Sequence, residues 1–252
     1  MNAHTHLASR EKAREKRFSA YWKQSLNDVF ADVAPYYDSA NRVASLGLWR
    51  WFLSRFIAVI NVRPGERVLD VCAGTNAIGI ALLQHEPSLE VHAMDRSAAM
   101  QEVGQQRACA RGLRIQSVIG DVHKLPFPND HFDVVTLQFA SRHLRVKTVF
   151  EEIHRVLKPG GRFCHCDMLR PDNPVVETIY YGYLRICLIF TGFLFRSGPA
   201  AMNSKRYFLD VLKMFYRADE LSGILREIGY RDVSAKSLLG GMIGMHHATK
   251  SI

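Results

Sequence analysis

A short apolar run that ends in an acid and turns through small residues constrains this chain more than any other feature. Val68–Val71 is β-type apart from Asp70, Cys72–Thr75 are small residues, and residues 77–83 are again apolar. This order predicts a strand, a tight turn and a helix start, where backbone N–H groups can approach a nucleotide-like ligand. Because Asp70 suits a cationic amine better than a pyrophosphate, the loop indicates S-adenosylmethionine (SAM) rather than NAD.

The residue that closes this loop breaks the expected pattern. Asn76 stands where such loops usually carry a third small residue, glycine. We expect Asp70, Gly74 and Thr75 to contact the cofactor, and Asn76 is the departure from the usual pattern.

Strand and helix patterns alternate through the middle of the chain. Two helices are predicted before them, at 10–30 and 43–61, and Pro159-Gly160-Gly161 is expected to end a helix and start a strand. This alternation favours an α/β fold, a doubly wound and mostly parallel sheet with helices on both faces. The predicted strands are 67–71, 90–94, 115–119, 132–139 and 162–167, and the helices between them are 77–85, 97–111 and 146–157.

Three acids fall at or just after the ends of successive predicted strands, where open α/β sheets bind ligands. Asp70 ends the first strand, Asp95 ends the second, and Asp121 follows the third. An acid after the second strand can accept both ribose hydroxyls, and one after the third can accept an adenine amino group. Each could also be a solvated strand end or a helix cap, but the set favours an adenosyl ligand.

Residues 1–28 are predicted to form a basic helical arm in a chain of net charge +9. It is either solvated and frayed, or it rests on anionic lipid with Phe18, Tyr21 and Trp22 at the interface. No nucleic-acid-reading motif accompanies the charge. An odd number of cysteines, five, indicates reduced thiols, and no apolar signal core is visible, so we expect a cytoplasmic location.

Residues 174–196 form a long apolar and aromatic stretch that Arg185 interrupts. The uncharged run is too short to span a bilayer, which takes about 20 residues. A lid helix over an apolar pocket, an interfacial helix and a plain core helix all remain possible, and we place the lid segment at about 174–215.

Several motifs together resemble class I SAM-dependent methyltransferases, and among them the ubiquinone/menaquinone-biosynthesis C-methyltransferases of the UbiE type. The resemblance covers nearly the whole chain from Val29. The motifs are Val33–Asn41, the Leu-Pro-Phe-Pro loop at 125–128, Phe139–His143, Arg155–Arg162, Ser204–Tyr207 and Glu227–Tyr230.

The resemblance implies a seven-stranded Rossmann-like sheet, with residues 29–252 as the SAM-binding domain. The cofactor contacts carried over fall on Thr75, Asp95 and the Asp121-Val122 pair, and a family serine aligns with Gln138. Tyr37 and Asp38 are expected near the mouth of the cofactor and substrate pockets.

Arg142 matches the arginine expected over the quinol ring, followed by His143 in place of asparagine, and Asp167 replaces a glutamate. Since arginine stays protonated, we expect Arg142 to stabilise a phenolate or to orient a water molecule. His143 is a candidate general base with a pKa near 7, although a structural histidine at a helix start explains it equally well.

No metal is expected. Cys164 and Cys166 would share one face of a strand with no zinc-like second pair, so they are interpreted as buried structural cysteines. His246-His247 is interpreted as a pair at a strand end.

The predicted function is SAM-dependent methylation of a polyprenyl quinone or quinol by an enzyme held peripherally at the inner face of the membrane, as a homodimer or in a biosynthetic complex. One alternative is UbiE-like conversion of ubiquinone to rhodoquinone by ring amination. Another is a non-catalytic quinone-binding partner in which Asn76 blocks the cofactor loop.

Overall fold

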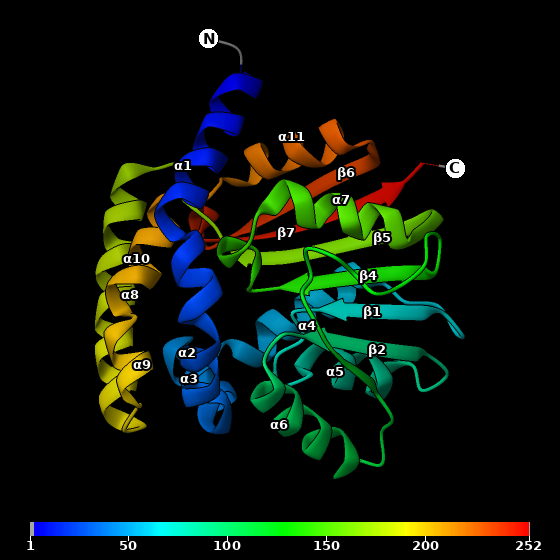
Figure 1. Ribbon diagram of the computed structural model, residues 1–252, viewed down its shortest axis with the longest axis horizontal. Coiled ribbons are helices and arrows are strands. Elements are labelled where there is room, and N and C mark those ends of the chain that lie inside the picture. The colour runs from blue at the N-terminus through cyan, green and yellow to red at the C-terminus, as the bar shows by residue number, and fades with distance from the viewer. Residues whose placement is uncertain (1–2, 252) are drawn as a thin grey trace.

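The computed structural model describes residues 3–251, and its centre is one seven-stranded sheet (Figure 1). The strand order is β3-β2-β1-β4-β5-β7-β6, in which β1 to β5 are parallel and β7 is antiparallel to both its neighbours. The predicted α/β class and sheet are therefore confirmed. The strands are β1 Arg67–Val71, β2 Glu90–Asp95, β3 Gln116–Ile119, β4 Phe132–Gln138, β5 Leu157–Met168, β6 Tyr230–Leu238 and β7 Ile243–Lys250.

Helices cover both faces of the sheet, and side chains alternate between the two cores. On β5, Phe163 packs into one core with Phe150, while Cys164 packs into the other with Phe56. Cys166 is also fully buried, as a structural cysteine should be. The covering helices are α4 Trp49–Ile60, α5 Ala77–His85, α6 Ala98–Cys109, α7 Val146–Val156 and α11 Ala218–Ile228.

A separate layer of helices lies at the carboxyl edge of the parallel strands (Figure 1). It combines the beginning of the chain with a segment from its last third. From the N-terminal part come α1 Ala3–Gln24, α2 Leu26–Val33, the 3-10 turn η1 Ala34–Tyr36 and α3 Tyr37–Ala44; from the later part come α8 Pro174–Leu194, α9 Pro199–Asn203 and α10 Lys205–Lys213.

Three predicted boundaries were wrong. The helix expected at 10–30 is two helices that meet at Ser25, and the one expected at 43–61 is broken by a turn in which Leu46 and Gly47 have positive φ. Helix α7 ends at Val156 and β5 begins at once, so Pro159-Gly160-Gly161 lies inside the strand.

The basic arm is packed against the rest of the protein. Phe18 and Trp22 are buried against α10, so they are not available to a lipid surface, and the expectation of a solvated or lipid-bound aromatic face was wrong here. Arg14 is fully buried, and its Nη2 donates to the carbonyl of Arg142 at 2.8 Å. The first helix therefore supports the segment that carries a predicted site residue.

His246 and His247 lie in the middle of β7 rather than at its end. His246 is fully buried, and its Nδ1 lies 3.2 Å from Nδ1 of His165 on β5. Among residues 3–251, no three or more His, Cys, Asp or Glu side chains gather as a metal-binding group.

No single described helix has the length and apolar character needed to cross a membrane. One sharply bent pair, Leu26–Ala44 with Trp49–Ile60, passes on length and composition.

Candidate active site

The turn after β1 is made by residues in the left-handed region. Cys72, Gly74 and Asn76 have φ of 55°, 53° and 57°, which reverses the chain before α5 begins at Ala77. The backbone N–H of Gly74 donates to Asp95 Oδ2 at 2.8 Å, so the end of β2 holds the loop after β1. The predicted strand, turn and helix are thus one rigid unit.

Asn76 does not project into the site. Its side chain is buried toward α6, where its Oδ1 accepts from Gln101 Nε2 at 2.9 Å. A Cβ built at Gly104 of α6 would lie only 2.7 Å from Cγ and Nδ2 of Asn76, so the two residues are in close contact. Asparagine tolerates a positive φ better than most residues. Asn76 therefore replaces glycine without occupying the ligand side of the loop.

A small cavity opens beside this loop, and two of its polar atoms have no partner. Asp70 Oδ1 accepts from Thr136 Oγ1 at 2.6 Å, but the buried Asp70 Oδ2 and Gln138 Nε2 are unpaired among the described residues. The two atoms complement the ammonium and carboxylate of an α-amino acid, as in the methionyl part of SAM. The cavity is lined by Tyr37, Trp49, Asp70, Cys72, Ala73, Gly74, Thr75, Ala77, Ile78, Gln138 and Phe139.

The unpaired oxygen of Asp70 has an electrostatic consequence. Burial raises the pKa of the Asp70 carboxyl to about 7, since the Thr136 hydrogen bond only partly offsets the loss of water. A cationic amine beside it would restore the ionised form.

The other two predicted acids lie on the same edge of the sheet. Asp95 is largely buried, which raises its pKa, and it accepts from the N–H groups of Gly74 and Ser97. Asp121 is 69% exposed; slight burial opposes its ionisation, but hydrogen bonds from His123 lower its pKa. Val122 is buried beside it. The arrangement leaves Asp121 open to a ligand's outer end.

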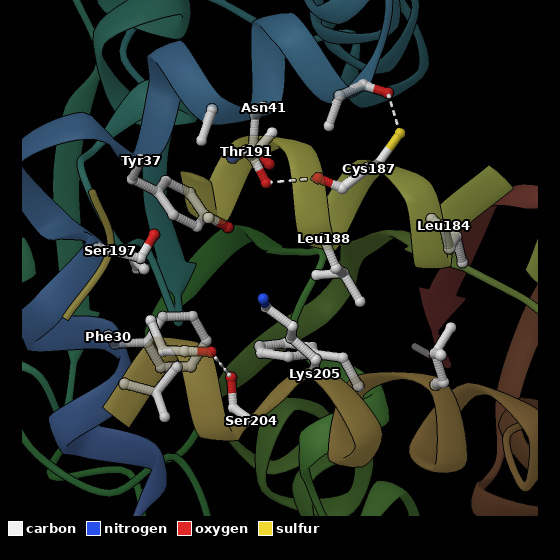
Figure 2. A pocket seen from close by; sticks show the side chains of 18 of the residues that line it. Phe30, Tyr37, Asn41, Leu184, Cys187, Leu188, Thr191, Ser197, Ser204 and Lys205 are labelled. Carbon is white, nitrogen blue, oxygen red and sulfur yellow. Dashed lines mark hydrogen bonds between the residues drawn. The ribbon is translucent and has the colours of Figure 1, made fainter. Parts of the chain in front are cut away.

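A second and larger cavity, of about 210 Å³, lies within the helical layer (Figure 2). Its wall is mostly apolar, and α8 covers one side of it, which is where a lid helix would lie. The polar groups that line it are few, among them Asn41, Arg142, Thr191, Ser197, Ser204 and Lys205.

Tyr37 belongs to the walls of both cavities. Its ring points into the larger one in Figure 2. Burial raises the pKa of its hydroxyl, with a smaller opposing effect from the nearby Arg142 charge. Tyr37 therefore lies at the junction between the small cavity beside the loop Cys72–Asn76 and the apolar cavity.

Arg142 lines the larger cavity and is held from behind by Asp167. Its Nη1 donates to Asp167 Oδ1 at 2.5 Å and to the Phe139 carbonyl at 2.7 Å. Asp167 is completely buried and also accepts from Ser141 Oγ at 2.6 Å. Although burial opposes the charge, Asp167 raises the pKa of the guanidinium, so Arg142 is a fixed cation whose charge is already balanced.

His143 is buried and is not accessible to solvent in the way that a general base passing protons to water would be. It is buried among aromatic rings, and its Nδ1 lies 2.6 Å from the Tyr207 hydroxyl. Since Tyr207 accepts from Trp22 Nε1, its own proton is free to go to Nδ1. Burial, with the charges of Arg142 and Arg14, lowers the pKa of His143 well below its usual value rather than leaving it near 7.

A polar link that the sequence did not reveal joins α3 to the loop Cys72–Asn76. Asp38 accepts from Thr75 Oγ1 at 3.1 Å and pairs with Arg107 of α6, which also donates to the Thr75 carbonyl at 3.0 Å. Thr75 is thus turned toward Asp38. Sequence reasoning missed Arg107 and the cavity residues Trp49 and Lys205; only Lys205 had a signal, because it lies in one of the motif segments.

The profile of the ubiE/COQ5 methyltransferase family matches residues 18–250 of this chain. The chain belongs to this family. The resemblance found in the sequence is confirmed, and the protein is a methyltransferase whose methyl donor is SAM.

Curated relatives match along almost the full length. A protein of Ectopseudomonas mendocina named ubiquinone/menaquinone biosynthesis C-methyltransferase UbiE is 32% identical over 231 residues, covering 90% of this chain and 89% of the relative. A demethylmenaquinone methyltransferase of Geobacillus kaustophilus is 33% identical, with 89% and 96% covered. These names favour methylation and lend nothing to the ring-amination or non-catalytic alternatives.

Solved structures share the fold. A SAM-dependent methyltransferase from Aquifex aeolicus superposes with a TM-score of 0.57 at 18% identity, covering 79% of this chain and 89% of that one. A SAM-dependent methyltransferase from Thermotoga maritima gives 0.62 at 15% identity, with 89% and 99% covered. At such low identities the similarity shows that the sheet and its helices are shared, and it indicates nothing about the substrate.

Proposed function

We propose that this enzyme methylates a ring carbon of a polyprenyl quinol in ubiquinone or menaquinone biosynthesis. The observation that supports this most is the junction at Tyr37, where a cavity suited to the methionyl part of SAM meets a larger apolar cavity. The names of the two relatives above, which concern ubiquinone and menaquinone, point to the same substrate class.

The residues of the carboxyl edge would hold the cofactor. Asp70 would receive its ammonium, Gln138 its carboxylate, and Asp95 and Asp121 the ribose and adenine ends. Gly74 and Thr75 would form part of the wall, and Val122 would support the adenine end beside Asp121. When bound, SAM supplies an electrophilic methyl group on a sulfonium.

The work left to the protein is to position the ring and to keep its hydroxyl ionised. A quinol carbon becomes nucleophilic when the neighbouring hydroxyl loses its proton. The apolar wall holds the ring and excludes water, while Tyr37 fixes the ring's edge at the junction. Arg142 supplies hydrogen-bond donors from a guanidinium that Asp167 keeps immobile.

We assign His143 to positioning rather than to proton abstraction. Its Nδ1 is engaged by Tyr207 and its Nε2 is buried without a partner among the described residues. Through Tyr207 it joins α10 to the segment that carries Arg142. A quinol proton would then leave to water at the cavity mouth.

The direct test is incubation with methyl-labelled SAM and a demethylated quinol in detergent. We expect labelled quinone and an equal amount of S-adenosylhomocysteine (SAH). The matched control is Asp70→Asn, which should give much less of both products at the same low SAM concentration. Labelled SAM consumed without any labelled quinone would contradict the proposal.

We further propose that the outer face of α8 rests on a lipid surface. This helix lines the large cavity with Leu184 and Leu188, while its opposite side is apolar and exposed, with Ile186 at 67% and Phe193 at 83%. Exposed apolar stripes of this kind mark interaction sites. Arg185 and Arg196, also exposed, suit anionic headgroups. The stripe consists of Val175, Ile179, Ile186, Ile189, Phe190 and Phe193.

Sedimentation with vesicles tests this surface. We expect binding to phosphatidylglycerol-containing vesicles and loss of binding in Ile186→Glu with Phe193→Glu. The control Glu102→Gln, an exposed site on α6 and so outside the stripe, should bind as the wild type does. If vesicles do not bind but the sedimentation coefficient of the free protein falls in the double variant, the face is instead a contact between two copies of the chain.

A further inference from the structure

One cation in the large cavity has no counter-charge among residues 3–251. Lys205 begins α10, and Figure 2 shows its Nζ pointing into the middle of the cavity from the wall opposite Asn41 and Thr191. Among residues 3–251 its ammonium forms no hydrogen bond or ion pair. A buried or half-buried lysine without a partner is costly unless a ligand supplies one.

The acids nearest in sequence or on neighbouring elements are committed elsewhere. Asp32 accepts from the backbone of Ala200 and Ala201, Asp38 pairs with Arg107, and Asp210 pairs with Arg17. No carboxylate belongs to the described wall of the cavity. The other titratable or charged groups in that wall are Tyr36, Tyr37, Arg142 and Cys187.

The two cations of the cavity differ in what they can offer a ligand. Arg142 is balanced by Asp167 at 2.5 Å, whereas none of the acids that the structure describes pairs with Lys205. The cavity as a whole therefore favours an anionic ligand, and the excess positive charge sits on Lys205.

Lys205 packs beside a glycine of α8. Gly192 is buried opposite α10, and a Cβ built there would lie 3.6 Å from Lys205 Nζ, an ordinary contact distance, but only 2.9 Å from Met202 Sδ. Glycine in a helix interior costs about 1 kcal/mol relative to alanine. The glycine therefore makes room for Met202, and the Lys205 ammonium lies against its backbone at the cavity wall.

We propose that Lys205 is the residue that binds the ionised ring oxygen of the substrate, an aromatic enolate or phenolate, and that Arg142 orients the ring as a neutral ion pair with Asp167. This rests on the proposed function for the identity of the ring. The hydroxyl gives its proton to water, the electron pair stays on the oxygen, and the ammonium of Lys205 stabilises that charge.

Binding of two naphthoquinones tests the role proposed for Lys205 without any turnover. The probes are 2-hydroxy-1,4-naphthoquinone, which is an anion at pH 7, and neutral 1,4-naphthoquinone, each titrated in the presence of SAH. We expect Lys205→Met to weaken the anion by at least about tenfold and to leave the neutral ring within about twofold. Lys205→Arg should restore most of the anion's affinity.

The control is Lys213→Met, which removes the same charge from the exposed end of α10, outside the cavity. It should change neither affinity, and SAH affinity should be the same in all variants if each is folded. Equal affinity of the wild type and Lys205→Met for the anion would overturn the proposal.

The same variants separate this proposal from the proposed function. If wild type methylates quinol, Lys205→Met should shift the rising limb of its kcat–pH profile to higher pH, because the ring oxygen loses its stabilising charge. If no quinol is methylated but the anion still depends on Lys205, the proposed substrate fails and the anion site stands.

Discussion

The two cavities are built in different ways. The small cavity, which we assign to the cofactor, uses mainly the ends of β1 and β4 and the loop between β1 and α5, so the register of a parallel sheet places most of its groups; Tyr37 and Trp49 close it from the helices. The larger cavity, which we assign to the substrate, is enclosed by helices from both ends of the chain, held by side-chain contacts such as Trp22 Nε1 to the Tyr207 hydroxyl at 2.9 Å. Damage to helix packing should therefore affect the substrate site while the cofactor site persists.

The largest effect is expected for Asp167→Asn. This change leaves the buried Arg142 guanidinium without its counter-charge, which costs about 3–5 kcal/mol in the free energy of unfolding. Urea unfolding at pH 7, followed by circular dichroism, measures it. Asp172→Asn, at a carboxylate that is 80% exposed, is the control and should stay within about 0.5 kcal/mol. A loss for Asp167→Asn as small as the control's would contradict the role given to this pair.

Arg14→Met comes next and tests the difference between the cavities most directly. Arg14 is buried and donates to the carbonyls of Arg142 and Leu144, so we expect a loss of about 3 kcal/mol in unfolding free energy. Quinol KM should rise, but SAH affinity by calorimetry should stay within about twofold. Arg17→Met, at an exposed ion pair, is the control. Parallel loss of SAH binding would mean that the two cavities are not independent.

Asp70→Asn should affect the small cavity, which we assign to the cofactor. We expect SAH affinity to fall by about 10- to 100-fold, because the ammonium loses its carboxylate. In wild type, the pKa of Asp70 is raised to about 7, so the carboxyl is protonated below this pH and SAH affinity should fall as pH drops from 8 to 6. The variant should lose that slope. A wild-type affinity that is flat across this range would refute the assignment.

The smallest effect is expected for Asn76→Gly. Glycine relieves the positive φ but gives up the hydrogen bond from Gln101, and the two changes nearly cancel. SAH affinity should change by less than about threefold. Asn76→Ala keeps the strain and loses the bond, so its unfolding free energy should fall by about 1–2 kcal/mol. A large gain in SAH affinity for Asn76→Gly would show that Asn76 obstructs the loop.

The sheet and its ligand edge could be predicted from the sequence because their signals are local. The β1 strand and α5 have the predicted bounds, since apolar period and turn residues act over a few positions. The placement of Asp70 and Asp95 follows from strand ends alone. No local sequence signal marks the helix break at Ser25 or the turn at Leu46, because packing against other helices determines where these helices end.

The larger cavity could not be assembled from the sequence, because its signals are not local. Lys205 and Tyr37 are 168 positions apart in numbering yet share one wall, and only tertiary packing brings them together. The burial of Arg14 was equally hidden, since a basic residue on a helix is usually solvated. The motif resemblance identified Arg142 as a site residue, but only the structure shows that Asp167 neutralises its charge.

The contact between the first helix and the tenth has a consequence for synthesis. Trp22 and Tyr207 are 185 residues apart, so α1 emerges from the ribosome long before its packing partner exists. The strands β1 to β5 can pair while α1, with its buried Phe18 and Trp22, has nowhere to bury them. A nascent chain of this enzyme therefore exposes that aromatic helix until its last quarter is made, which makes it a natural target for chaperones.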